Sequence, residues 1–155
     1  MRAGLRIAFM TMVAALVLSG CETTKTASID TTKTAAIADT AARHLGEGRK
    51  QFAGQNYGLA ESHFRQAVEA EPLNGAAWLG LAASYDQLGR FDLSDRAYEQ
   101  LLKIEGPKPA ILNNQGYSHI LRGDKKKARK LLNQARAAMP ANTTVQENLK
   151  LLRRI

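Results

Sequence analysis

The residues that could do chemistry in this chain are one cysteine and three histidines. Cys21 is the sole cysteine, so it cannot form an internal disulfide. The histidines, His44, His63 and His119, are expected on different structural units, with no cysteine or carboxylate cluster beside them at the spacing of a metal site. The sequence has neither a GxSxG nucleophile motif nor a phosphate-binding glycine loop. We therefore predict that the protein is not an enzyme and binds no metal or cofactor, which leaves Cys21 as a candidate for covalent modification.

Cys21 follows a segment that is typical of secretory signal peptides. Arg2 and Arg6 precede an apolar run over residues 7–18, and two small residues come next. The run would be about 18 Å long as a helix, whereas a bilayer core of about 30 Å needs about 20 apolar residues. We therefore predict that residues 1–20 are a signal peptide rather than a membrane span.

The sequence LSGC at residues 18–21 resembles the bacterial lipobox. In that motif, signal peptidase cuts before the cysteine, whose thiol receives diacylglycerol and whose new amino group is acylated. The resemblance implies that Cys21 carries a covalent lipid anchor, because two or three acyl chains hold a protein stably at a membrane. Glu22 follows in place of the aspartate that marks inner-membrane retention in enteric bacteria, which resembles outer-membrane sorting. The alternative is an ordinary secreted protein with a stray thiol.

The segment after the cysteine is rich in threonine and alanine, and TTKTA occurs in it twice, at 23–27 and 31–35. It has few large apolar side chains, so burial cannot offset the entropy lost on ordering it. We predict that residues 21–40 form a flexible tether that begins with the lipidated cysteine. Its root-mean-square reach is on the order of 25 Å. The alternative for the last few residues is a helix that starts near Ile37.

From residue 41 onward the same residue types recur every 34 residues, which defines units 41–74, 75–108 and 109–142. Small residues at the recurring positions allow two helices to approach closely, and larger ones fill the space towards the next unit. The four recurring series are Ala60, Ser94 and Ala128; Phe64, Tyr98 and Leu132; Ala67, Leu101 and Ala135; and Gly48, Ala82 and Gly116. We predict an all-α fold of three helix–turn–helix units, in which residues 143–155 form a helix that caps the third unit.

These positions resemble the tetratricopeptide repeat, most closely in the middle unit, where Trp78, Leu81 and Tyr85 precede the turn LGRF. The resemblance implies a solenoid whose first helices line a groove for an extended peptide or a partner helix. Carried onto this sequence, the groove residues are Leu45, Arg49, Phe52, Leu79, Ala83, Asp86, Asn113, Tyr117, Ile120 and Leu121. For Phe52 and Leu79 the alternative is packing against neighbouring helices.

The positive charge is concentrated near the C-terminal end. The formal net charge is +8, and residues 109–142 carry seven basic side chains against one acidic one. The run RGDKKKARK at 122–130 forms a basic patch of Arg122, Lys125, Lys126, Lys127, Arg129 and Lys130. Such a run is ordinarily a solvated face, and the functional alternatives are anionic lipid headgroups or an acidic surface on a partner. We expect no nucleic acid as a partner, because the predicted signal peptide places the protein outside the cytoplasm.

The combination of lipoprotein signal, tether, three repeats and capping helix resembles the TadD family of tight-adherence (Flp-type) pilus systems, with most of the likeness in residues 111–135. The resemblance implies an outer-membrane-anchored factor that faces the periplasm and binds a secretin or another pilus or secretion component, as a pilotin does. One alternative is an envelope chaperone or a scaffold for outer-membrane-protein assembly. Another is a lipid- or cell-wall-proximal adaptor that acts through residues 122–130. The oligomeric state stays open.

Overall fold

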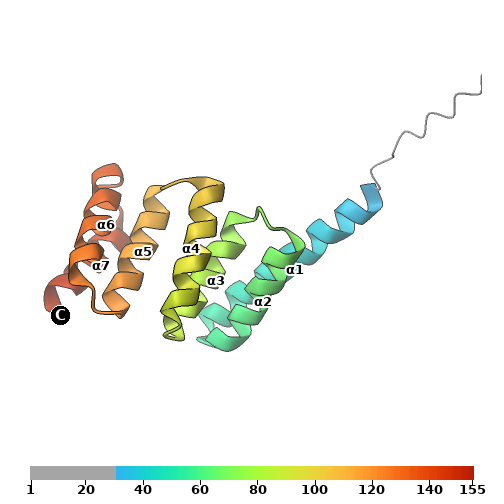
Figure 1. Ribbon diagram of the computed structural model, residues 1–155, viewed down its shortest axis with the longest axis horizontal. Coiled ribbons are helices and arrows are strands. Elements are labelled where there is room, and N and C mark those ends of the chain that lie inside the picture. Colours follow the sequence, from blue (N-terminus) through green and yellow to red (C-terminus); the bar gives the residue numbers. More distant parts are fainter. Residues whose placement is uncertain (1–30) are drawn as a thin grey trace, which may run out of the picture.

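The computed structural model describes residues 31–155, which form seven helices joined by short turns (Figure 1). The predicted signal peptide, Cys21 and the first part of the predicted tether lie outside the described residues. The helices are α1 (Thr31–Ala53), α2 (Tyr57–Ala70), α3 (Gly75–Gln87), α4 (Phe91–Glu105), α5 (Pro109–Leu121), α6 (Lys125–Ala138) and α7 (Thr143–Arg154). None of these seven is long and apolar enough to cross a membrane.

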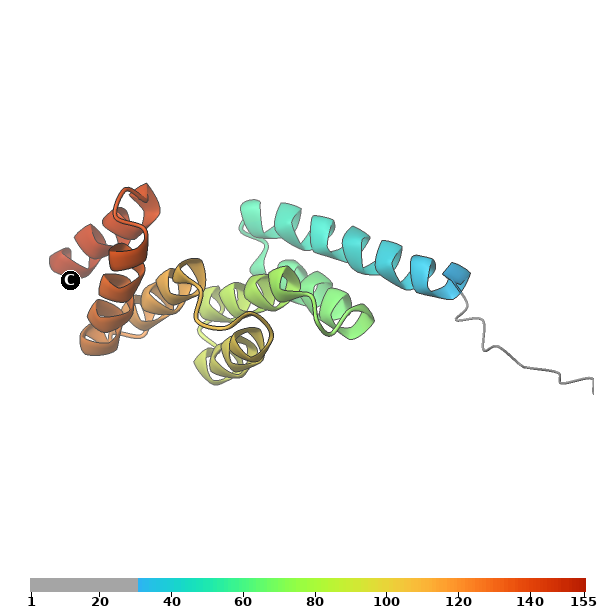
Figure 2. The same ribbon diagram turned by 90° about the horizontal axis from the view of Figure 1, so that it is seen from above.

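Helices α1 to α6 form three consecutive pairs that stack into an elongated array, and α7 follows the third pair (Figures 1 and 2). The starts of α2, α4 and α6 are spaced by 34 residues, and so are the starts of α3, α5 and α7. This spacing equals the sequence period, so the predicted units at 41–74, 75–108 and 109–142 each contain one helix pair. The predicted fold class, an all-α solenoid of three helix–turn–helix units with a capping helix, is confirmed.

Helix α1 begins ten residues earlier than the predicted first unit. The tether prediction is therefore wrong for residues 31–40, which are helical. Residues 32–39 are exposed, so no core holds them in place. The cause is local: alanine has the highest helix propensity, and adding residues to an existing helix costs far less than nucleating one. The packed part of α1, which starts at the buried Ala41, supplies the nucleus.

Phe64 of α2 fixes how closely the first two units stack. A Cβ atom placed on Gly48 of α1 would lie 2.8 Å from the ring of Phe64, and one placed on Gly80 of α3 would lie 2.4 Å from it. Both distances are well inside van der Waals contact, so only glycine fits on either side of this ring. The result is that α1, α2 and α3 converge on one aromatic side chain.

The three turns inside the units use the same backbone conformation, but the first turn lacks the residue that favours it. Gln55, Gly89 and Gly123 occupy equivalent positions and have φ angles of 61°, 69° and 80°. Glycine adopts this left-handed region freely, whereas for other L-residues it costs about 1–2 kcal/mol. The first turn is therefore the most strained of the three.

The predicted capping helix is present as α7. Its side chains Val145, Leu149 and Leu152 are buried against the third unit, in a cluster that includes Leu132. The side chain of Asn142 accepts a hydrogen bond from the Val145 amide at 3.0 Å and so caps the start of the helix. Helix α7 thus covers the apolar face that the last repeat would otherwise leave open.

Candidate functional site

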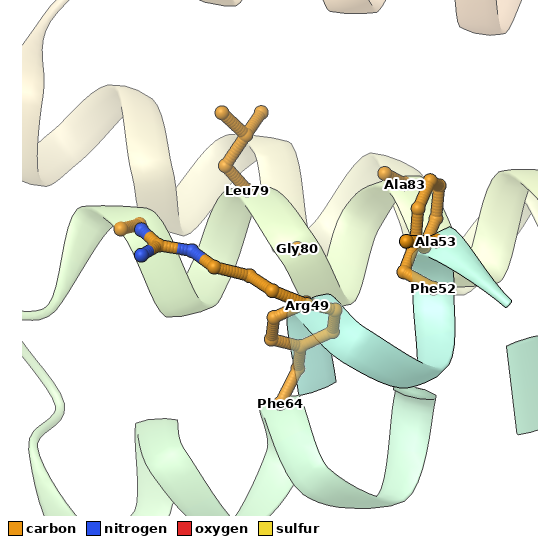
Figure 3. A pocket seen from close by; sticks show the side chains of 8 residues that line it. Arg49, Phe52, Ala53, Phe64, Leu79, Gly80 and Ala83 are labelled. Carbon is orange, nitrogen blue, oxygen red and sulfur yellow. The ribbon is translucent and has the colours of Figure 1, made fainter. Parts of the chain in front are cut away.

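Helices α1 and α3, the first helices of the first two units, border a pocket of about 290 Å³ (Figure 3). Four of the predicted groove residues line it: Arg49, Phe52, Leu79 and Ala83. The remaining lining residues, which the sequence analysis did not assign to the groove, are Ala53, Phe64, Ala76 and Gly80. Apart from the guanidinium of Arg49, every side chain of the pocket is apolar.

The pocket exists because small residues lie beside aromatic rings that are held in place. Ala53 and Ala83 have side chains too short to fill the space between the two helices, and Gly80 has none. Phe52 is held from outside the pocket, because its ring makes an edge-on contact with Tyr57 at 5.2 Å between centroids. Figure 3 shows Phe52 beside Ala53 and Ala83 at one end of the pocket. The walls are therefore preformed.

Arg49 supplies the one charge of the pocket. Its side chain stretches past Leu79, so that the guanidinium lies at the end opposite Phe52 (Figure 3). Arg49 is exposed and has no ion-pair partner among the described residues, whereas the adjacent Lys50 pairs with Glu47 at 3.6 Å. A free guanidinium next to apolar walls is suited to bind a carboxylate with two hydrogen bonds.

Three further residues of the predicted groove lie outside this pocket. Leu45 of α1 packs against the apolar core of the first two units. Tyr117 is half-buried on α5, and Leu121, at the end of the same helix, is exposed. The groove prediction therefore describes one pocket in the first two units rather than a continuous row of side chains along all three.

In the third unit the predicted groove residues are used by the capping helix. Asn113 is buried, and its Oδ1 accepts a hydrogen bond from the side chain of Asn148 on α7 at 3.0 Å. Ile120 is buried in the apolar cluster that α7 completes. Assigning these two side chains to a free groove was wrong, because α7 packs where the first helix of a fourth unit would lie.

Asp86 was also assigned to the groove, and this assignment was wrong. The carboxylate is only 4% exposed and accepts hydrogen bonds from the Ser118 hydroxyl at 2.6 Å and the Tyr98 hydroxyl at 3.2 Å. Burial raises the pKa of Asp86, while the hydrogen bonds from these hydroxyls and the charge of Arg122 act in the opposite direction. Asp86 therefore ties α3 to α4 and α5, and no ligand can reach it from the groove.

Arg122 was assigned to the basic patch, but it belongs to the same buried junction. Its guanidinium donates to the Ser118 hydroxyl at 2.7 Å and to the Asp95 carboxylate at 2.9 Å, and it lies 4.8 Å from the centroid of the Phe91 ring. Burial opposes the charged form of Arg122, but the hydrogen bond and charge of Asp95 raise its pKa overall. Arg122 is therefore already neutralised and is not part of a free cationic surface.

The other five residues of the predicted basic patch are exposed on α6. Lys127 pairs with Asp124 at 3.7 Å, and Lys125 donates to the backbone carbonyl of Ile155. Lys126, Arg129 and Lys130 have no ion-pair partner among the described residues. These five residues thus form a basic surface on α6.

Two of the histidines meet, and the expectation that all three lie on different units was wrong, because positions 44 and 63 both fall within unit 41–74. His44 of α1 and His63 of α2 belong to the same helix pair, and their Nδ1 atoms are 3.2 Å apart. Burial and the charge of Arg43 lower the pKa of His44, so the neutral ring is favoured in this contact. Among residues 31–155 there is no group of three or more histidine, cysteine or carboxylate side chains that could hold a metal ion.

The family model of the tetratricopeptide repeat matches residues 45–94 and again residues 84–143. The chain belongs to the tetratricopeptide-repeat family. Tetratricopeptide domains are protein-interaction scaffolds rather than enzymes, and the pocket between α1 and α3 lies between the first helices of two such repeats. No curated protein matches the sequence.

Solved tetratricopeptide domains share this arrangement of helices. The Arabidopsis OM64 TPR domain matches with a TM-score of 0.67 at 17% identity, covering 76% of this chain and 98% of that one. The first TPR domain of Spaghetti (RPAP3), described as bound to an HSP90 peptide, matches with a TM-score of 0.65 at 16% identity, covering 76% and 93%. Pseudomonas aeruginosa pilF matches with a TM-score of 0.64 at 23% identity, covering 76% of this chain and 54% of that one. At these identities the likeness shows the fold alone.

Proposed function

We propose that this protein is a lipid-anchored tetratricopeptide scaffold of the bacterial envelope, and that it holds a short segment of a partner protein between α1 and α3. The observation that carries the proposal is the preformed pocket, in which the unpaired Arg49 lies at one end of walls made by Phe52 and Leu79. A volume of about 290 Å³ is at the small end of ligand pockets, so it admits one or two side chains rather than a folded domain.

The chemistry of the pocket describes the segment that it takes. An apolar side chain fits between Phe52 and Ala83, and a carboxylate fits the guanidinium of Arg49. The segment is therefore extended or helical. It carries an apolar side chain of about the size of leucine close to an acidic residue or to a C-terminal carboxylate. The peptide-bound state of the RPAP3 domain supports this mode, because the two proteins share the fold that forms the groove.

We propose further that the partner is a secretin or another component of a tight-adherence pilus, with the protein anchored through Cys21 to the outer membrane and facing the periplasm. The support is the order of signal-like segment, cysteine and repeats, together with the likeness of residues 111–135 to the TadD family. The second candidate is an envelope chaperone or a scaffold for outer-membrane-protein assembly. It is favoured by the almost wholly apolar lining of the pocket, which would also accept exposed apolar segments of unfolded clients.

Charge reversal in the pocket is expected to weaken partner binding by at least about tenfold, because it places a carboxylate of the protein against the carboxylate of the partner, and such like-charge contacts cost several kcal/mol. The variant is Arg49→Glu, and its matched control is Arg96→Glu, which reverses an exposed and unpaired arginine on α4. Affinity is measured by titrating each variant against the partner recovered from envelope extract. Recovery of a secretin supports the pilus proposal, whereas recovery of many unfolded envelope proteins supports the chaperone. Equal affinities of the two variants would contradict the pocket as the site.

The lipid anchor makes a separate prediction. Cys21→Ser is expected to move the protein from the membrane fraction to the soluble fraction, because it removes the thiol that receives the diacylglycerol. Fractionation after a high-salt wash measures this, since salt strips proteins that are held by charge alone. A Cys21→Ser protein that still sediments with washed membranes would show that the anchor lies elsewhere.

A further inference from the structure

The end of the solenoid formed by α6 and α7 has a surface of free positive charge. We define the basic face as Lys126, Arg129, Lys130, Arg136 and Arg153. All five are exposed, and none has an ion-pair partner among the described residues. Arg136 and Arg153 lie outside the basic run at 122–130, so the sequence pattern did not include them.

The cations of this face converge on two adjoining hollows. One has a volume of about 460 Å³ and is lined by Lys125, Lys126, Arg129, Lys130 and Asn133. The other has a volume of about 300 Å³ and is lined by Arg129, Asn133, Arg136, Leu149, Leu152 and Arg153. Arg129 and Asn133 belong to both hollows, so the two form one continuous surface, and no carboxylate lines either of them.

Three arginines elsewhere in the described residues are neutralised by carboxylates, whereas Arg49 and Arg96 are isolated cations. Glu61 pairs with Arg65 and also with Arg90, the latter at 2.9 Å, and Asp95 pairs with Arg122. The basic face lacks such partners although the chain carries 14 acidic residues. Like charges on neighbouring turns of α6 repel one another, which destabilises a helix slightly. An external anion removes this cost.

We propose that the basic face docks the protein onto a bilayer of anionic phospholipid, with the lipid phosphates bound by the cations of α6 and α7. Clusters of four to eight basic side chains on an amphipathic helix bind anionic membranes with about 1 kcal/mol per cation, or about fivefold in affinity. Helix α6 is such a helix, because Ala128, Leu132 and Ala135 are buried on one side while the cations occupy the other. From Lys126 to Arg136 the cations extend over about 15 Å of helix, at about 1.5 Å per residue.

A membrane fits this surface better than an acidic protein does. Specific protein interfaces fix their register with charges of both signs and with buried polar groups. The basic face has one sign of charge, flexible lysines and no buried polar side chain directed at a ligand. Such a surface matches an extended anionic layer with no defined register.

The basic face lies at one end of the helical array (Figures 1 and 2). The start of α1, to which the proposed anchor segment connects, and the α6–α7 end lie at opposite ends of the array (Figures 1 and 2). Docking through the basic face therefore holds the second end of the solenoid at the same bilayer as the anchor. This inference does not depend on the pocket between α1 and α3, and it uses the proposed function only in placing the protein beside a membrane.

The test compares two variants of the full chain that change the net charge equally. Both, like the wild-type reference, also carry Cys21→Ser, so that the proposed acyl chains do not hold every protein on every vesicle. Lys126→Glu/Lys130→Glu reverses two cations of the basic face, and Arg96→Glu/Lys103→Glu reverses two exposed, unpaired cations of α4. Co-sedimentation with vesicles containing phosphatidylglycerol, at low salt, measures the partition coefficient. We expect the first variant to partition at least about 25-fold more weakly than the wild type, from about fivefold per cation. The partition coefficient of the second variant is expected to differ from that of the wild type by no more than about twofold. Vesicles of pure phosphatidylcholine measure binding through the N-terminal segment, which all variants share.

Several results would overturn the inference. An equal loss of binding in the two variants would show that net charge alone drives it. Equal binding of the wild type to both vesicle types would show that the phosphates of anionic lipid play no part. Competition by inorganic phosphate beyond its effect on ionic strength would identify a site for free phosphate instead. Tighter binding to polyglutamate than to vesicles, lost in the first variant, would assign the face to an acidic protein.

Discussion

A chain that stops after Asn142 will aggregate. Helix α7 covers the end of the third unit with Val145, Leu149 and Leu152, and the cluster beneath them includes the fully buried Leu132. Without α7 the cluster residues that remain on α5 and α6, such as Leu132, face water, because the last helix pair cannot bury its open face alone. We expect the truncated chain to elute as soluble aggregates in size-exclusion chromatography, whereas the intact chain does not. A truncated chain that stayed monomeric and equally stable to heat would contradict the role of α7.

A pair of substitutions measures the same effect without shortening the chain. Leu149 is 8% exposed and Leu151, two residues later on the same helix, is 36% exposed. Leu149→Ala is expected to lower the free energy of unfolding by about 3 kcal/mol, because it removes transfer energy and leaves a cavity. Leu151→Ala is expected to lower it by less than about 1 kcal/mol, because that side chain is partly hydrated already. Urea titration followed by circular dichroism gives both values, and equal values would refute the packing described for α7.

Asp86→Ala is expected to lower the free energy of unfolding by about 3 kcal/mol. The buried apolar side chains form two clusters, one mainly in the first two units and one in the third unit with α7. Asp86 bridges these parts by accepting from Tyr98 in the second unit and Ser118 in the third. The substitution leaves both hydroxyls buried without their acceptor, at about 1–3 kcal/mol for each unsatisfied group.

The matched control for this prediction is Asp95→Ala, which removes the other carboxylate that contacts Arg122. The Asp95 side chain is 51% exposed, so its ion pair is screened by water and contributes no more than about 1 kcal/mol. Urea titration compares the two variants. If Asp86→Ala were as stable as Asp95→Ala, the buried junction would not be what joins the third unit to the second.

The repeat could be predicted because its signal is periodic. Residues such as Ala60, Ser94 and Ala128 recur at the sequence period, and all three are fully buried where paired helices meet. The same periodicity brought Arg49 and Leu79 to one pocket, since both lie on first helices. For these residues, the helix and the position within the repeat were enough to predict where the side chain lies.

Errors arose where a partner distant in sequence decides the role of a residue. Asp86 occupies a first helix and fits the groove pattern, yet one of the two hydroxyls that it binds is on Ser118, in the next unit. Arg122 stands in a run of cations, but it precedes the turn at Gly123 and pairs with Asp95 of the preceding unit. The helical start of α1 was missed for a different reason, because a low apolar content says little about a helix extended from a packed neighbour.

The central claim, that the pocket between α1 and α3 holds a segment of an envelope protein, is tested most directly by site-specific photocrosslinking in living cells. A photoreactive phenylalanine analogue replaces Leu79 in the pocket, or Arg96 on α4 as the control position. The account predicts a crosslink from position 79 to a secretin or another pilus component, and its loss when Arg49→Glu is added. A crosslink to that partner from position 96 but none from position 79 would contradict it.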